Sequence, residues 1–192
     1  MGPERAGRAV SVSVGGTPGV EWDAVVLAGG RGSRLGGVDK AAVVVGGRTL
    51  LAHALDAVRA AGRVVVVGPA KDVPGVLWAR EEPPGGGPLA GLAAGLAHVR
   101  APWVAVLAVD QPGVTASTVE RLLAAGGPAV LVDGEGHRQW LAGVWRTAAL
   151  RAALPTVPSG SSMRSVLGPL DPAGVPALPG EAHDVDTPAD LR

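Results

Sequence analysis

One glycine-rich segment carries most of the residues in this chain that could do chemistry. Residues 27–40 read LAGGRGSRLGGVDK, with five glycines between positions 29 and 37. Glycine permits positive φ angles, so neighbouring backbone N–H groups can converge on the oxygens of a phosphate group. Arg34 and Lys40 add fixed positive charge, which stabilises a leaving pyrophosphate more than the bound triphosphate. The segment therefore predicts a site that binds a nucleoside triphosphate and transfers a phosphate-containing group.

Two better-known glycine motifs fit this segment less well. A P-loop places Ser or Thr directly after Gly-Lys, whereas here Lys40 is followed by Ala41. A dinucleotide fingerprint that started at Gly30 and Gly32 would need a third glycine where the chain has Leu35. A loop with incidental charges is the remaining alternative, but it does not explain why one of only two lysines ends the segment.

Carboxylates elsewhere in the chain could hold a metal ion for this transfer. Asp110 follows the apolar run 103–108, and ligands gather beyond the carboxyl ends of strands in open α/β sheets. Asp184 and Asp186 alternate along the chain, so on a strand they would share one face. Mg²⁺ prefers hard oxygen ligands and needs only one or two carboxylates beside the phosphates. We therefore expect Asp110, with either Asp184 or Asp186, to hold magnesium.

Composition limits the classes of partner. The chain has 192 residues, a formal net charge of +0 and only 3% aromatic residues, so nothing favours nucleic acid or an anionic membrane surface. It contains no cysteine, which excludes disulfides and thiolate chemistry and fits a reducing compartment. Its longest apolar runs, such as 101–109, are about half of the roughly 20 residues that a membrane helix needs. We expect a cytoplasmic protein without a membrane span.

The elements that would position these groups alternate between strands and helices, which is typical of an α/β fold. Several apolar runs are continuous, as expected for strands that are buried on both faces of a sheet. The predicted strands are 23–28, 42–45, 63–67, 76–79, 103–108, 129–132 and 141–145. The predicted helices are 50–61, 89–99 and 117–125, the last opened by a capping box over residues 117–120.

The length of the chain fits one domain. We expect residues 22–192 to form it, and residues 1–21, which lack a continuous apolar run, to be a flexible extension and not a secretory signal. After Ala148 proline and glycine become frequent, and in the segment 157–180 the only helical candidate is 163–167. This composition predicts a loop-rich flap over the substrate.

Residues 27–40 resemble the first motif of the molybdenum cofactor guanylyltransferases, a family of nucleotidyltransferases. Gly30 is typical of guanine-using members, whereas cytidylyl-transferring relatives often have alanine at that position. Residues 81–91 resemble the second motif, which ends in Gly-Pro-Leu-Ala-Gly and whose acidic residue, here Glu82, contacts the nucleoside. Residues 183–191 resemble the closing motif, which favours Asp186 as the second metal ligand.

The resemblance implies a three-layer α/β/α fold of the Rossmann-like, nucleotide-diphospho-sugar transferase type with a mostly parallel sheet. It implies transfer of GMP from MgGTP to molybdopterin bearing molybdenum, with release of pyrophosphate. The implied catalytic residues are Lys40, Arg34 and Asp110, and the implied Mg²⁺ ligands are Asp110 and Asp186. The implied nucleotide-binding residues are Leu27, Ala28, Gly29, Gly30, Lys40, Glu82 and Asp110. The implied partners are GTP, a molybdopterin-type acceptor, and the proteins that insert molybdenum or receive the product.

The acceptor side and the substrate pair leave alternatives open. Arg138 and Arg164 could bind the phosphate of the acceptor by bidentate contacts, or they could be solvated surface arginines. A relative with the same fold could use CTP or another phosphorylated acceptor. A nucleotide-binding module without turnover is a further alternative, motivated by Glu82 and Val109, which depart from the family's usual residues.

Overall fold

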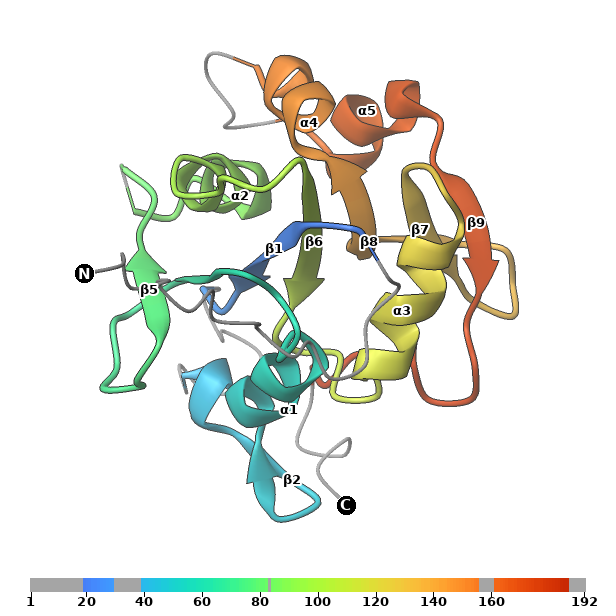
Figure 1. The fold of residues 1–192 in the computed structure, drawn as a ribbon. Helices are drawn as coiled ribbons and strands as arrows, with labels where there is room; N and C mark the ends of the chain where they lie inside the picture. The colour runs from blue at the N-terminus through green and yellow to red at the C-terminus, as the bar shows by residue number, and fades with distance from the viewer. Residues whose placement is uncertain (1–18, 30–38, 83, 156–160, 187–192) are drawn as a thin grey trace, which may run out of the picture.

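A seven-stranded sheet forms the centre of the computed structural model, which describes residues 19–29, 39–82, 84–155 and 161–186 (Figure 1). The strand order is β5-β4-β1-β6-β8-β7-β9. The strands are β1 (Trp22–Leu27), β4 (Val64–Val67), β5 (Val76–Ala79), β6 (Trp103–Ala108), β7 (Ala129–Val132), β8 (Arg138–Arg146) and β9 (Ala173–Pro176). Every neighbouring pair in this sheet is parallel except the two pairs that β8 makes, with β6 and with β7. The mostly parallel sheet that the resemblance implied is confirmed.

Helices cover both faces of the sheet and complete three layers (Figure 1). On one face α1 (Leu50–Ala57) and α3 (Ala116–Ala124) pack into a core that includes Val26. On the other face α2 (Pro88–Leu96), α4 (Thr147–Ala153) and α5 (Met163–Leu167) pack into a core that includes Val25. Neighbouring side chains of a strand point to opposite faces, and both faces of β1 are covered, so all six of its residues are buried. Five of them are apolar, and the sixth, Asp23, accepts hydrogen bonds from the Arg100 and Ala101 N–H groups.

The first residues of α1, α2 and α3 explain where these helices begin, and the start of α3 differs from the prediction. Thr49 caps α1 by accepting a hydrogen bond from the backbone N–H of Ala52. Pro88 opens α2, where its missing N–H is not needed. The predicted capping box over residues 117–120 is wrong, because α3 begins earlier and Thr115 and Thr118 form the box.

Two segments differ from the sequence-based prediction. Residues 42–45 do not join the main sheet: β2 (Val44–Val45) pairs only with β3 (Arg48–Thr49) in a short hairpin, after a 3-10 turn, η2 (Lys40–Ala42). Beyond Ala148 the chain is less loop-rich than expected, because α4, α5, a 3-10 turn η3 (Gly168–Leu170) and β9 lie there. Strand β9 pairs with β7 at the sheet edge, where proline is tolerated.

The structure describes only the last three residues of the predicted N-terminal extension. Residues 1–18, most of the predicted extension 1–21, lie outside the described residues. Among the described helices, none is both long and apolar enough to span a membrane.

Candidate active site

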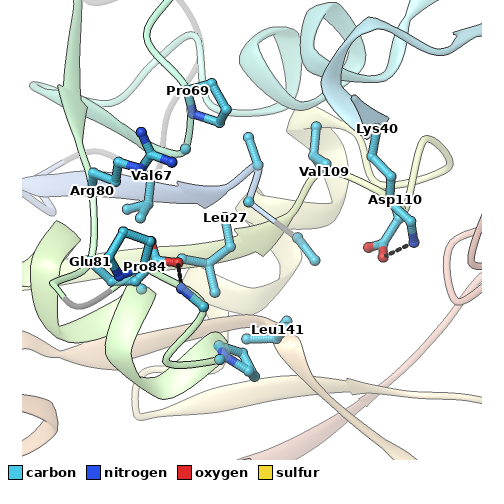
Figure 2. A pocket seen from close by; sticks show the side chains of 18 of the residues that line it. Leu27, Lys40, Val67, Pro69, Arg80, Glu81, Pro84, Val109, Asp110 and Leu141 are labelled. Carbon is cyan, nitrogen blue, oxygen red and sulfur yellow. Dashed lines mark hydrogen bonds and ion pairs between the residues drawn. The ribbon is translucent and has the colours of Figure 1, made fainter. Parts of the chain in front are cut away.

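A cleft of about 950 Å³ opens where parallel strands of the sheet end (Figure 2). Ligands bind at this edge in open α/β sheets because the loops that follow neighbouring strands separate there. The cleft is lined by Leu27, Ala28, Gly29, Asp39, Lys40, Val67, Gly68, Pro69, Arg80, Glu81, Pro84, Gly85, Gly87, Pro88, Gly91, Ala108, Val109, Asp110 and Leu141. Most of these residues lie at or after the ends of β1, β4, β5 and β6 or in the first part of α2, and Leu141 comes from β8.

Backbone hydrogen bonds hold the floor of the cleft. The Ala28 N–H donates to the Val67 carbonyl at 2.9 Å, and the Val109 N–H donates to the Leu27 carbonyl at 3.0 Å. Gly68 has a φ of 156° and lies so close to Ala28 that a Cβ atom would be 3.2 Å from the Ala28 carbonyl carbon. Backbone atoms therefore form the floor of the cleft, which lets a ligand approach backbone polar groups closely.

The first turn of α2 faces the cleft through Gly87 and Pro88. Gly87 has a φ of 84°, a conformation that suits glycine. The free N–H groups and the dipole at a helix N-terminus favour anions. Glu81 accepts a hydrogen bond from the Gly85 N–H at 3.1 Å and so holds the loop that precedes the helix. This wall of the cleft is suited to a nucleotide.

A lysine joins two carboxylates on the opposite side of the cleft from α2, where Figure 2 shows Lys40 beside Asp110. The Lys40 ammonium donates to Asp110 Oδ2 at 3.1 Å and to Asp186 Oδ1 at 2.5 Å. Burial lowers the pKa of Lys40, but the hydrogen bonds and charges of Asp186 and Asp110 outweigh it, so the pKa is raised above its ordinary value. Lys40 is therefore charged, and a segment near the C-terminus meets the ends of β1 and β6 at this point.

Asp184 lies in the same acidic cluster but has a different partner. Gln111 donates to Asp184 Oδ1 at 2.9 Å, and the Val185 N–H donates to the Asp110 carbonyl at 2.8 Å. Burial, together with the charges of Asp110 and Asp186, raises the pKa of Asp184. Residues 183–186 belong to no strand, so the prediction that Asp184 and Asp186 share a strand face is wrong; a backbone contact places them beside Asp110 instead.

The donor set fits magnesium. One oxygen of Asp110 and one of Asp186 already contact a single cationic nitrogen, so both carboxylates can reach one cation. Within the described part of the chain, no group of three or more His, Cys, Asp or Glu side chains is placed so that it could hold a metal ion. Mg²⁺ keeps several waters and also binds substrate phosphates, so two carboxylates are sufficient.

The structure brings together most, but not all, of the predicted site residues. Leu27, Ala28, Gly29, Lys40 and Asp110 line the cleft, and Asp186 contacts Lys40. Gly30 and Arg34 lie outside the described residues. Glu82 is exposed and is not a lining residue, whereas its neighbour Glu81 is.

Sequence reasoning missed the ion pair at the rim of the cleft. Lys71, in the loop that follows β4, pairs with Asp39, whose other carboxylate oxygen accepts a hydrogen bond from the Ala41 N–H at 3.0 Å. Lys71 is the only other lysine in the chain, which was the one available signal. The ion pair connects the segment that carries Lys40 to the loop that follows β4.

Arg138 and Arg164 line a second cavity, of about 540 Å³, together with Trp140 and Asp171. Arg138 also donates to the Pro172 carbonyl. The two arginines therefore share one hollow, although they are far apart in the sequence. The start of β8 connects this hollow to the cleft, because Leu141 lines the cleft and Gln111 donates to Gln139 at 3.3 Å.

Fold and cleft together define a nucleotidyltransferase domain, and comparison with known proteins agrees. The model of the MobA-like NTP transferase domain matches residues 24–173. The chain belongs to the MobA-like NTP transferase family. It is 39% identical over 124 residues to the molybdenum cofactor guanylyltransferase of Pseudomonas putida, a match that covers 60% of this chain and 65% of the relative. It is 32% identical over 177 residues to the probable molybdenum cofactor guanylyltransferase of Deinococcus radiodurans, covering 88% and 91% of the two chains.

Solved structures share the fold. The 2-C-methyl-D-erythritol 4-phosphate cytidylyltransferase of Thermus thermophilus is 26% identical and superposes with a TM-score of 0.69 over 87% of this chain and 94% of that chain. The molybdopterin-guanine dinucleotide biosynthesis protein A of Archaeoglobus fulgidus is 21% identical, with a TM-score of 0.68 over 88% and 94% of the two chains. At these identities the comparison supports the Rossmann-like α/β/α architecture.

Proposed function

We propose that this protein transfers GMP from MgGTP to molybdopterin bearing molybdenum, forming a guanine dinucleotide cofactor and pyrophosphate. One observation carries the proposal: Lys40, Asp110 and Asp186 meet at the mouth of a cleft whose other wall is the N-terminus of α2. This arrangement supplies cationic, carboxylate and N–H groups around one site, as nucleotidyl transfer from a metal-bound triphosphate requires. The names of the relatives support the choice of guanine and of a molybdopterin acceptor.

In this proposal the chain binds the nucleotide mainly through backbone groups. The nucleotide lies between residues 27–29 and the first turn of α2, whose free N–H groups favour its phosphates, and the phosphates extend toward Lys40. Asp110 and Asp186 would hold magnesium, which supplies charge neutralisation at the phosphates. Lys40 then turns from the two carboxylates to the phosphate oxygens and stabilises the charge that develops on the leaving pyrophosphate.

The transfer itself needs no protein nucleophile. A phosphate oxygen of the acceptor forms a bond to the α-phosphorus, and the bond from that phosphorus to the bridging oxygen of pyrophosphate breaks. Since the acceptor already carries an ionised oxygen, alignment and charge stabilisation are sufficient. We propose that Arg138 and Arg164 bind the acceptor's anionic end in the second cavity, since both line it and guanidinium groups suit phosphate.

Pyrophosphate release tests the proposal. The purified protein is given magnesium, a molybdopterin-type acceptor and GTP, CTP, ATP or UTP in turn. Release with GTP alone is expected. Release with CTP instead would keep the chemistry but refute the choice of base, a result to which the similarity to a cytidylyltransferase gives weight. Binding without release for all four nucleotides would indicate a nucleotide-binding module and refute the transfer reaction.

A further inference from the structure

A buried glutamate lies outside the cleft and has no role in the chemistry proposed above. Glu181 is 4% exposed and accepts four hydrogen bonds. Its Oε1 atom accepts from Arg121 Nη1 at 2.7 Å and from the Thr118 hydroxyl at 2.5 Å. Its Oε2 atom accepts from Arg121 Nη2 at 2.9 Å and from the Leu178 N–H at 2.7 Å. Both oxygens are satisfied, and the arginine contact is bidentate, which fixes orientation as well as distance.

The charge of Glu181 is well stabilised. Burial alone would raise the pKa of its carboxyl, but the hydrogen bonds from Arg121, Thr118 and the Leu178 N–H lower it to about 2. Both Arg121 and Thr118 belong to α3. The ionised carboxylate therefore fastens residues 178–181 to a helix that is itself packed on the sheet.

The fastened segment leads directly to the acidic cluster of the candidate active site. Asp184 and Asp186 follow Glu181 by three and five residues. Gly113, in the loop after β6, packs against Gly180 so tightly that a Cβ atom on Gly113 would lie 2.1 Å from the Gly180 carbonyl oxygen. Beyond the turn, the Val185 N–H donates to the Asp110 carbonyl at 2.8 Å. The segment is thus held at Gly180, at Glu181 and at Val185, and its two carboxylates, Asp184 and Asp186, lie on either side of Val185 in the sequence.

We propose that Glu181 is a positioning residue: through its contacts with Arg121 and Thr118 it fixes Asp184 and Asp186 relative to Asp110 and Lys40. This inference rests on the proposed function insofar as Asp186 is a metal ligand. Glu181 does not line the cleft, and its carboxylate is hydrogen-bonded to Arg121, Thr118 and the Leu178 N–H, which do not line it either. Its removal therefore affects the geometry of the carboxylates and leaves the nucleotide wall, formed by residues 27–29 and α2, as it is.

Arg121→Gln tests this role. It removes the bidentate contact, together with the bond from Arg121 to the Pro176 carbonyl at 3.0 Å, while Thr118 and the Leu178 N–H still donate to the carboxylate. Arg151→Gln is the matched control. Arg151 also joins a helix to a neighbouring segment, by donating to the Leu96 carbonyl at 2.7 Å and the Val99 carbonyl at 2.6 Å, both outside residues 177–186. Both variants lose an arginine that joins a helix to another segment. Only Arg121 holds the segment that carries Asp184 and Asp186.

Two measurements are made on the full chain. Hydrogen exchange reports the protection of the Val185 amide, which depends on its bond to Asp110 and needs no substrate. The magnesium concentration for half-maximal pyrophosphate release reports the carboxylate geometry, together with the KM for GTP. In Arg121→Gln we expect faster exchange across residues 182–186 and an increase of about tenfold in the magnesium requirement, since outer contacts of metal ligands commonly have effects of this size. At saturating magnesium the KM for GTP should stay close to the wild-type value.

Arg121→Lys should restore part of both properties, and Arg151→Gln should change neither. An Arg121→Gln protein that is folded, exchanges at Val185 as the wild type does and keeps its magnesium requirement would overturn the proposal. Equal effects in Arg121→Gln and Arg151→Gln would also overturn it, because they would reveal a general loss of stability. If the wild-type protein releases no pyrophosphate, the proposed function fails, and the exchange of Val185 alone decides whether Glu181 positions the segment.

Discussion

Replacing Glu181 with glutamine should make the protein less stable by an amount that depends on pH. The pKa of Glu181 falls from its ordinary value of 4.5 to about 2 in the folded protein. A difference of this size corresponds to about 3 kcal/mol at neutral pH, since each pKa unit is worth about 1.4 kcal/mol. Solvent screens this carboxylate little, because its side chain is almost fully buried. Glutamine keeps the size of the side chain and cannot carry the charge that Arg121 and Thr118 stabilise.

The sign of the effect follows from the direction of the shift. A carboxyl whose pKa is lowered by folding contributes stability above its unfolded pKa, and loses that contribution as the pH falls through its folded pKa. The free energy of unfolding should therefore differ between wild type and Glu181→Gln by about 3 kcal/mol at pH 7, by about half of that at pH 3, and by less than about 1 kcal/mol at pH 2. Urea denaturation of both proteins at these pH values measures the difference.

A constant difference from pH 7 to pH 3 would refute this reasoning, since it would mean that the substitution acts through packing and not through the charge. Asp133→Asn is a control. The pKa of Asp133 is also lowered, first by the hydrogen bond from the His137 N–H, but its hydrogen bonds lie in an exposed turn. Solvent screening should make its effect on unfolding much smaller than that of Glu181→Gln.

Three further predictions concern the active site and the packing of α2. Lys40→Ala should lower turnover by roughly 10²–10³-fold, as the loss of a group that stabilises transition-state charge does, while Lys71→Ala should stay near the wild-type rate in the same pyrophosphate assay. Asp186→Asn should raise the magnesium concentration needed for turnover, and chelation of magnesium should abolish turnover in the wild type; unchanged activity with chelator would exclude the metal. Gly95→Ala should destabilise the protein by about 1–3 kcal/mol, because a Cβ atom there would lie 2.6 Å from a Val25 methyl group. Gly91→Ala, whose Cβ atom would have contacts no closer than 3.5 Å, should be neutral or stabilising in the same denaturation experiment.

The centre of the fold could be predicted because burial on both faces leaves a simple pattern. Residues 24–27 of β1, and all of β4 and β6, are continuous stretches of apolar residues, as expected of strands in a parallel sheet that is covered on both faces. Strand β9 could not be recognised, because Ala173–Pro176 contains glycine and proline and is held by a parallel neighbour that is more than forty residues away in sequence. The prediction of a sheet strand at residues 42–45 was wrong for the opposite reason: three consecutive valines satisfy a strand pattern, but only two of them form a strand, and it does not join the main sheet.

The site was predictable where a motif is local and unpredictable where it depends on distant contacts. Lys40 and Asp110 could be placed from the ends of predicted strands, and the cleft brings them together. Asp186 was expected nearby, but the alternation that suggested a strand was not the cause of its position; the bond from Val185 to Asp110 is. Nothing in the sequence links Glu181 to Arg121, sixty residues earlier, because a single acidic residue among prolines and glycines has no pattern.

The ion pairs of Lys40 also affect how the active site is filled. Without substrate, the acidic pair of Asp110 and Asp186 has a tethered ammonium as its counterion. In a magnesium-dependent transferase, Mg²⁺ that binds without a nucleotide must displace that ammonium, which is then left without an anionic partner from the substrate. A metal–nucleotide complex instead brings phosphate oxygens that accept the ammonium as the metal takes its place. Metal and nucleotide are thus coupled ligands, and each should bind more tightly when the other is present.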